Sequence, residues 1–480
     1  MDTEEFRRYG TDMVNYIADY YDTLRSRLPT PDVQEGYLRK LIPEQAPTEA
    51  ESYDDVKKDL EDVIMKGVLH WRSPHFHGYI GIAGSFPALI GDMLVGALSS
   101  NSFSWVSNPA STELEVCMMD WLGQMLNLPE EFLFSSGGKG GGVIQRTADD
   151  SVLVAIIAAR SRSIRQHKDM TPGQTLDKLV AYTSEEAHSC IKKAAQLALV
   201  TIRNLPTDAN FSLRGETLAA AIKEDKSKGL IPFFLGASVG TTSTIAIDNL
   251  CELGPICERE NMWMHIDGAY AGSAAICPEL RYVINGVEYS TSFCLNPHKW
   301  LHVNKSCSAM WVKNREFITE AFSVDVEYLK NHKLHGDTTM PDYRNWQIQL
   351  SRPFTSLKVW FVLRMFGVKG LQDRIRKDVT LAKEFETLVL GDDRFEIVAE
   401  VNLGVVCFKL KGDNGLNREL SKRINDDRRV YLTPSISKGV FFLRFVVTVH
   451  NIESSDVTYA WSVIQEQADL LLKSQVNAAS

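Results

Sequence analysis

Short apolar runs alternate with helical patterns over residues 86–360, and this alternation restricts the possible folds more than any other feature of the chain. It is typical of an α/β fold, in which crossover helices join the strands of a mainly parallel sheet. In such sheets, ligands bind beyond the carboxyl ends of the strands. The predicted strands are residues 179–182, 231–237, 262–266 and 292–295, and the predicted helices include residues 151–162, 190–199 and 218–224.

The segment before this region, residues 1–85, has a helical pattern without a clear core of its own. Helical stretches are expected at residues 6–24 and 53–69. The first stretch carries an apolar stripe that it cannot cover by itself. We therefore expect a helical dimerisation arm that packs against a second copy of the chain in a homodimer.

The segment after residue 360 predicts a small α+β domain. A helix is followed by strands at residues 395–399, 405–410 and 440–447 and by a final helix from Val457. A chain of 480 residues exceeds what one hydrophobic core usually organises. We therefore expect three parts, namely the arm at 1–85, a large ligand-binding α/β domain at 86–360 and the small domain at 361–480.

Charge and cysteine usage favour a cytoplasmic globular protein. The net charge of -9 argues against nucleic acid or an anionic membrane surface as the main partner. The N-terminal residues lack the basic and apolar pattern of a signal peptide and no apolar run reaches about 18 residues, so we expect neither a signal peptide nor a membrane span. The eight cysteines lack paired C-x-x-C spacing, which favours reduced core thiols over disulfides or a metal site.

Two residues that follow predicted strands suggest a specific chemistry. Asp267 ends the apolar run at 262–266, and Lys299 follows the run at 292–295 after an Asn-Pro turn. A lone lysine is commonly only a solvated surface charge. However, a lysine that forms a Schiff base and an acid that keeps a pyridine nitrogen protonated are the minimal protein contribution to pyridoxal phosphate (PLP) chemistry. Together, in this order, the two residues predict a PLP site.

Three further features each allow a functional and a structural interpretation. The glycine run at 137–142 precedes a predicted helix, so it is either an anion-binding turn or a flexible surface loop. The Gly-Thr-Thr-Ser turn at 240–243 places hydroxyl groups after a strand, or is simple turn chemistry. His188 follows the strand at 179–182, where its ring either stacks on a flat cofactor or is a satisfied buried histidine.

The sequence resembles the group II PLP-dependent amino-acid decarboxylases almost from end to end. Within this family it is most similar to the aromatic-L-amino-acid decarboxylase and histidine decarboxylase branch. The resemblance implies the aspartate aminotransferase-like fold type I. The motifs that carry it include Phe-Ser-Trp at 103–105, Gly-Gly-Gly-Val-Ile-Gln at 140–145, Ala-His-Ser at 187–189, His-Ile-Asp at 265–267 and Asn-Pro-His-Lys-Trp at 296–300.

The resemblance implies roles for individual residues. Lys299 would hold PLP through a Schiff base, Asp267 would pair with the pyridine nitrogen and His188 would stack on the ring. Tyr328, in a predicted lid at 325–346, would protonate the substrate carbon after carbon dioxide leaves. Thr242 and Ala269 match positions beside the cofactor, and the phosphate pocket is expected to contain Thr147, Ala148, Asp149, Asn296 and His298.

Several residues depart from the family pattern. Asp149 replaces the usual phosphate-binding serine, and a carboxylate about 5 Å from a phosphate charge costs roughly 3 kcal/mol at an effective dielectric constant near 20. Asn101, Ile82 and Lys305 are also unusual, and Ser351 goes with histidine or phenolic substrates rather than indoles. The predicted substrate pocket comprises Tyr79, Ile80, Ile82, Asn101, Phe103, Lys305, Ser351 and Arg352, the last as a loop anchor.

The expected reaction is therefore PLP-dependent decarboxylation of an aromatic L-amino acid, dopa-like, tyrosine-like or histidine, to its amine and carbon dioxide. One alternative is an aldehyde synthase, in which oxygen captures the intermediate and the products are an aldehyde, ammonia and peroxide. His188 and Tyr328 favour simple decarboxylation over that alternative. A second alternative, a cofactor-poor homologue without catalysis, is favoured only by Asp149, Asn101 and Lys305.

Overall fold

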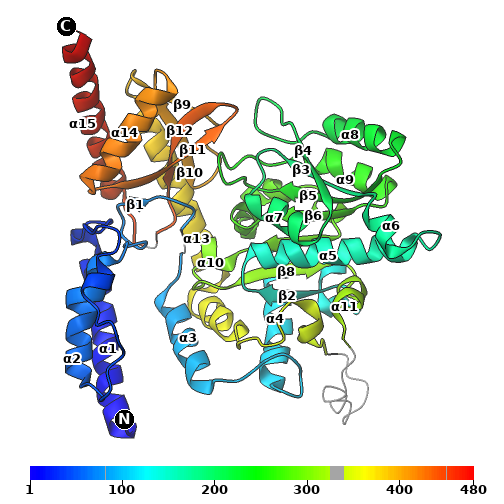
Figure 1. Ribbon diagram of the computed structural model, residues 1–480, viewed down its shortest axis with the longest axis horizontal. Coiled ribbons are helices and arrows are strands. Elements are labelled where there is room, and N and C mark those ends of the chain that lie inside the picture. The colour runs from blue at the N-terminus through cyan, green and yellow to red at the C-terminus, as the bar shows by residue number, and fades with distance from the viewer. Residues whose placement is uncertain (82, 325–339, 450, 480) are drawn as a thin grey trace. The chain divides into compact units, whose positions relative to one another are not determined.

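The chain forms two compact units in a computed structural model that describes residues 1–81, 83–324, 340–449 and 451–479 (Figure 1). The first unit contains Met1–Gly81, Leu381–Val398 and Val406–Ser480, and the second contains Ile82–Thr380 and Ala399–Val405. Within the described residues, each helix is too short or too polar to cross a membrane. The expected three-part division remains a prediction.

A seven-stranded sheet in the second unit confirms the predicted α/β fold. Its order is β2-β8-β7-β6-β5-β3-β4. Neighbouring strands from β4 to β7 are parallel, whereas β8 is antiparallel to both β7 and β2. The strands are β2 (Gly141–Gln145), β3 (Leu179–Ser184), β4 (Thr201–Leu205), β5 (Ile231–Ser238), β6 (Trp263–Asp267), β7 (Ser292–Leu295) and β8 (Ser308–Val312).

Helices cover this sheet in two groups. Helix α5 (Ala148–Gln166) packs against α7 (Ser189–Leu197), α11 (Glu316–Phe322) and the central strands, and Figure 1 shows it lying across the sheet. The second group is α8 (Gly215–Ser227) and α9 (Leu250–Arg259), which pack against each other and against β4, β5 and β6. Among the described residues of this unit, the other α-helices that begin here are α3 (Phe86–Leu98), α4 (Pro109–Leu126), α6 (Pro172–Leu176), α10 (Pro297–Trp300) and α13 (Ser356–Leu390).

The four strands predicted in the large domain are confirmed with shifts of at most two residues at their ends. Strands β2, β4 and β8 were not expected from the sequence. Strand β4 is partly exposed and includes the polar residues Arg203 and Asn204, because it lies at the edge of the sheet. It therefore lacks the continuous apolar run that marks a strand buried on both faces.

The glycine run at 137–142 is not a surface loop along its whole length. Gly141 and Gly142 begin β2 and are buried. A Cβ atom at Gly141 would lie 2.5 Å from a ring carbon of Phe134, and one at Gly142 would lie 2.5 Å from the methyl carbon of Met119. These two glycines are therefore required by close packing rather than by an anion.

The first unit contains a second sheet with the order β1-β11-β12-β10-β9. Helix α14 (Asn414–Asp427) packs against β11, β12 and the final helix α15 (Ser454–Ala479). In the core of this unit, the rings of Phe385 and Phe445 stack with their centroids 3.7 Å apart. The strands are β1 (Phe76–His77), β9 (Phe395–Ile397), β10 (Val405–Leu410, whose first residue belongs to the second unit), β11 (Tyr431–Ser437) and β12 (Val440–Val446).

Two helices form the N-terminal segment of the first unit. Helices α1 (Thr3–Thr23) and α2 (Tyr53–Asp59) meet through Tyr9 and Tyr53, whose rings stack with centroids 4.2 Å apart. No residue of α1, all of which the structure describes, is buried. The predicted helix at 53–69 is interrupted, because its backbone changes to a π-helical turn at Leu60–Ile64 and a 3-10 turn at Met65–Gly67.

Candidate active site

Lys299 and Asp267 lie at the carboxyl ends of two neighbouring parallel strands. Asp267 is the last residue of β6 and is paired in register with Cys294 of β7. After β7, the single turn of α10 carries Lys299, whose backbone N–H donates to the carbonyl of Asn296 over 2.8 Å. The backbone N–H of Asn296 in turn donates to Ala269 over 3.0 Å. These bonds fix the lysine turn beside Asp267, as the sequence predicts.

Burial changes the acidity of the lysine. Burial lowers the pKa of Lys299. Of the charges that raise this pKa, the Asp267 carboxylate has the largest effect. A lowered pKa increases the fraction of neutral amine near pH 7, and only the neutral amine attacks an aldehyde. Lys299 as a whole residue is partly exposed, unlike the buried residues on either side of it in the chain.

Both carboxylate oxygens of Asp267 have donors within the protein. Oδ1 accepts a hydrogen bond from the backbone N–H of Ala269 over 3.0 Å, and Oδ2 accepts one from the Cys190 thiol over 3.8 Å. The side chain is buried, with 7% of its residue surface exposed. A buried carboxylate with a fixed orientation is suited to holding a positive charge in place.

His188 is the N-cap residue of α7, shortly after the carboxyl end of β3. Its Nδ1 accepts a hydrogen bond from the backbone N–H of Cys190 over 3.2 Å. Because an accepting ring nitrogen carries no proton, neutral His188 holds its proton on Nε2. The ring is therefore fixed at the same edge of the sheet as Asp267, although its stacking role stays a prediction.

The predicted phosphate residues lie in two segments, the N-terminus of α5 and the turn that carries Lys299. Thr147 caps α5 in a reciprocal pair with Asp150, which donates its N–H to Thr147 Oγ1 over 3.4 Å. Ala148 is buried, whereas Asp149 is exposed. The Asn296 Oδ1 atom is buried and has no hydrogen-bond partner among the described residues. This orphaned atom fits a site that a polar ligand completes.

His298 and Thr242 complete the predicted cofactor set. The His298 Nδ1 lies 2.6 Å from the carbonyl oxygen of Cys307, and burial lowers the pKa of His298 to about 4. The ring is therefore neutral near pH 7 and adds no positive charge to the pocket. Thr242 is partly exposed in the turn after β5, beside the hydrogen-bonded hydroxyls of Thr241 and Thr244.

Three of the predicted substrate residues in the second unit, Asn101, Ser351 and Arg352, form a hydrogen-bonded group. Asn101 donates through Nδ2 to Ser351 Oγ over 3.1 Å, and its Oδ1 accepts from the Arg352 backbone N–H over 3.1 Å. The Arg352 guanidinium is buried and donates to Glu115 Oε1 over 2.6 Å. Phe103 accepts a backbone hydrogen bond from Arg344, and the Lys305 residue is exposed.

Four predicted residues cannot be placed against this group. Tyr79 and Ile80 belong to the first unit, where the Tyr79 backbone N–H donates to Thr433 Oγ1 over 2.7 Å. Ile82 and Tyr328 lie outside the residues that the structure describes, as does most of the predicted lid at 325–346. Their roles stay predictions.

Sequence reasoning missed two residues that the structure connects to this site. Cys190 links Asp267 to His188, and Glu115 neutralises Arg352. The only local signal for Cys190 was its position two residues after His188, in the first turn of a helix. Glu115 had no comparable signal, because its partner lies 237 residues away.

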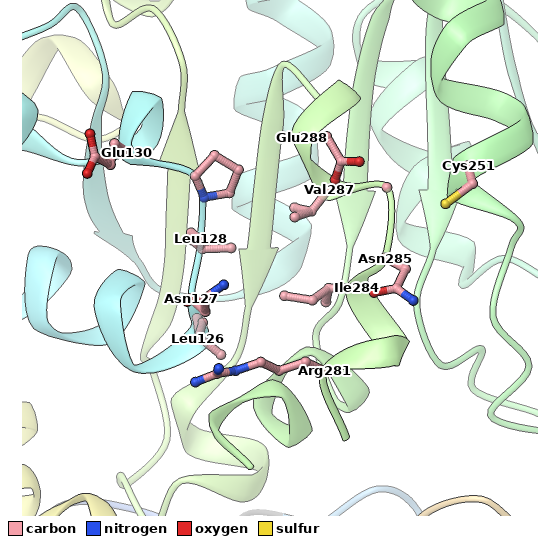
Figure 2. Close-up of a pocket in the computed structure, with 12 residues that line it drawn as sticks. Leu126, Asn127, Leu128, Glu130, Cys251, Arg281, Ile284, Asn285, Val287 and Glu288 are labelled. Atoms are coloured by element: carbon pink, nitrogen blue, oxygen red, sulfur yellow. The ribbon is translucent and has the colours of Figure 1, made fainter. Parts of the chain in front are cut away.

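Cavities also occur away from these residues. One of about 510 Å³ is lined by residues 126–130, by Cys251 and by part of the segment 281–288, and Figure 2 shows its lining side chains. Another, of about 330 Å³, lies beside Phe134 and Arg315. Lys299 and Asp267 do not line either of these two cavities.

Three features occur at the carboxyl ends of the parallel strands. Lys299 has a lowered pKa, the Asp267 carboxylate is buried, and the buried Asn296 Oδ1 has no hydrogen-bond partner among the described residues. This combination defines a PLP-dependent enzyme of fold type I, and the residues fit the cofactor.

Comparison with known proteins identifies the family. The pyridoxal-dependent decarboxylase conserved domain matches residues 35–411. Aromatic-L-amino-acid decarboxylase of Mus musculus is 53% identical over 99% of this chain and 100% of its own length. The chain belongs to the pyridoxal-dependent decarboxylase family, and it is a PLP-dependent carboxy-lyase.

Two solved structures support the same assignment. The tryptophan decarboxylase of Catharanthus roseus in complex with L-tryptophan is 41% identical, with a TM-score of 0.93 over 98% of this chain and 99% of that chain. The 4-hydroxyphenylacetaldehyde synthase of Rhodiola rosea is 37% identical, with a TM-score of 0.91 over the same shares of the two chains. The predicted family and the predicted fold are thus confirmed.

Proposed function

We propose that this protein decarboxylates an aromatic L-amino acid and releases the corresponding amine and carbon dioxide. The observation that carries the proposal is the placement of Lys299 beside Asp267 at neighbouring strand ends. Full-length similarity to the mouse aromatic-L-amino-acid decarboxylase supports the aromatic substrate class.

Each residue of the site has a separate task in this proposal. When bound, PLP supplies the electron sink for the electron pair that remains after carbon dioxide leaves. Lys299 offers a neutral amine, because burial lowers its pKa. Asp267 holds a positive charge at a fixed position, because both of its oxygens are hydrogen-bonded. His188 orients a flat ring by stacking, and Asn296 Oδ1 accepts a hydrogen bond that the described residues do not provide.

The pair Asn101 and Ser351 favours a ring with polar substituents. Both residues are exposed, and their mutual hydrogen bond holds a hydroxyl and an amide next to Arg352. A substrate with a phenol, catechol or imidazole ring can exchange hydrogen bonds with these groups. An unsubstituted indole presents a single N–H donor and needs more space. We therefore propose a tyrosine-like, dopa-like or histidine substrate before tryptophan.

An aldehyde synthase is the second candidate, because the Rhodiola rosea 4-hydroxyphenylacetaldehyde synthase is 37% identical to this chain. The two reactions differ in what reaches the substrate carbon after carbon dioxide leaves. A proton gives the amine, and oxygen gives the aldehyde with ammonia and peroxide. We place decarboxylation first because His188 and Tyr328 match the residues that go with it in the family.

One assay tests both candidates. The purified protein is incubated with PLP and, separately, with dopa, tyrosine, 5-hydroxytryptophan, tryptophan and histidine, and amine, aldehyde and peroxide are measured together. Decarboxylation predicts amine without peroxide. Equal amounts of aldehyde and peroxide would support the synthase. Lys299→Ala should abolish turnover and the visible absorption of the lysine–PLP adduct. A borohydride-reducible PLP adduct on another residue of this variant would contradict the assignment.

We further propose a homodimer. Five large apolar residues on one stripe of α3 are 42–52% exposed, and Phe6 of α1 is 66% exposed. Such a stripe is seldom left in water by a stable protein. The residues of the α3 stripe are Phe86, Ile90, Met93, Leu94 and Leu98. Light scattering should give twice the chain mass, and Ile90→Asp with Leu94→Asp should give monomers if the stripe is the interface.

We also propose that the enzyme works in the cytoplasm. All eight cysteines are free thiols, and six of them are buried. A reducing compartment keeps thiols in this state. Fractionation of the source cells, with antibody detection of the chain, tests the location, and recovery in a secreted fraction contradicts it.

A further inference from the structure

Cys190 is hydrogen-bonded to two residues that the proposed function assigns to the cofactor ring, Asp267 and His188. Cys190 is 2% exposed, and its thiol donates to Asp267 Oδ2 over 3.8 Å. The backbone N–H of the same residue donates to His188 Nδ1 over 3.2 Å. One residue thus restrains Asp267 through its side chain and His188 through its main chain.

We propose that Cys190 is a positioning residue that keeps the Asp267 carboxylate oriented towards the pyridine nitrogen of bound PLP. The inference rests on the proposed function. The backbone N–H of Ala269 restrains one oxygen of Asp267, and the thiol restrains the other. The terminal torsion of an aspartate is broad, so one donor alone leaves the carboxylate free to turn about it. Two donors on different oxygens define its plane.

The thiol is suited to this task because it keeps its proton. Burial, followed by the carboxylates of Asp267 and Asp149, raises the pKa of Cys190. A protonated thiol donates a hydrogen bond without placing a second negative charge beside Asp267. Cys294, the other buried thiol nearby, has a different neighbour, since its Sγ lies 3.6 Å from His265 Nε2. Cys190 is therefore the thiol directed at the carboxylate.

Cys190→Ala tests the inference with little other change, because it keeps the backbone N–H that binds His188. In the full-length protein we expect the dissociation constant of PLP to rise about tenfold, the effect of one hydrogen bond to a charged group. Cys190→Ser keeps a proton donor and should bind PLP more tightly than Cys190→Ala. Cys257→Ala is the matched control, because Cys257 is a thiol of α9 that is 1% exposed and should not affect PLP.

A vibrational readout separates positioning from packing. The Raman difference between the parent and Cys190→Ala isolates the S–H stretch of Cys190. We expect a frequency lowered by the carboxylate, and a higher frequency when Asp267→Asn removes the charge. Equal PLP affinity in the parent and Cys190→Ala would overturn the inference, as would equal losses in Cys190→Ala and Cys257→Ala. A parent that forms no adduct at Lys299 would instead overturn the proposed function.

Discussion

Asn101 and Ser351, two residues that depart from the family pattern, are hydrogen-bonded to each other over 3.1 Å although they lie 250 residues apart. The same Asn101 side chain accepts the backbone N–H of Arg352 over 3.1 Å. The two departures are therefore coupled, and a change at one position alters the partner of the other.

Ser351→Gly removes the hydroxyl that accepts a hydrogen bond from Asn101 Nδ2, whereas the bond from the Arg352 backbone N–H to Asn101 Oδ1 remains. We expect the ratio of kcat/KM for tryptophan to that for tyrosine to rise about tenfold, because space is gained and one polar partner is lost. Ser351→Ala is the control, since it removes the hydroxyl without creating as much space. If Asn101→Ala leaves the selectivity of the parent unchanged, the pair does not govern specificity.

Asp149 places a carboxylate near the amine, where the family usually has a serine. It is exposed in the first turn of α5, and its charge raises the pKa of Lys299 against the effect of burial. If it faces the phosphate, Asp149→Ser should tighten PLP binding by up to about a hundredfold. Asp149→Asn removes only the charge and should recover most of the gain. Equilibrium dialysis measures the dissociation constant of PLP for both variants. Constants equal to that of the parent would mean that the Asp149 side chain points away from the phosphate.

The buried ion pair between Glu115 and Arg352 gives a stability prediction. Glu115 is 1% exposed and also accepts the backbone N–H of Ile144 over 2.8 Å. Arg352→Met leaves this carboxylate without its counter-charge and should cost about 3–5 kcal/mol in free energy of unfolding. Adding Glu115→Gln should restore a large part of the loss, because the neutral amide still accepts from Ile144. Urea titrations of the parent, the single variant and the double variant provide the comparison.

Asp248 gives a dependence of stability on pH. It accepts backbone hydrogen bonds from Leu213 and Ser238 over 2.9 and 2.8 Å, yet burial raises its pKa to about 7. The unfolded chain loses this proton near pH 4, so the folded state binds more protons between pH 4 and about 7. The contribution of Asp248 to stability is therefore favourable at low pH, falls as the pH rises through this window, and then becomes constant.

The matched variant isolates this effect from other titrating groups. Asp248→Asn does not titrate, so the stability of the parent relative to the variant should decrease from pH 4.5 to pH 8, by on the order of 4 kcal/mol at most. Urea unfolding at several pH values measures the difference. A difference that does not change with pH means that Asp248 has an ordinary carboxylate pKa.

Tyr328→Phe tests the proton donor that the family resemblance places over the substrate carbon. The variant keeps the ring and removes the phenolic proton. We expect amine production to fall at least tenfold and aldehyde and peroxide to appear together, because general acid catalysis commonly contributes 10²–10⁴-fold. Amine formed at the parent rate without peroxide would exclude Tyr328 as the acid and make His188 the next candidate.

The fold could be predicted to the extent that it depends on local periodicity. Strands β5 and β7 are continuous apolar runs, and the sequence predicts them almost to the residue. Strand β2 was not predicted, because its glycines suggest a loop. Gly141 and Gly142 are suited to a strand only because Phe134 and Met119 leave no room for a side chain.

The sequence by itself determined which residues stand at strand ends, because the chain order of strand, turn and functional residue is local. Asp267 and Lys299 were assigned in this way, and the pairing of β6 with β7 brings them together. Only the tertiary structure decided that Cys190 meets Asp267 across 77 residues, that Asn101 meets Ser351 across 250 and that Glu115 meets Arg352 across 237. Such contacts depend on how separate elements pack, and local periodicity carries no information about that packing.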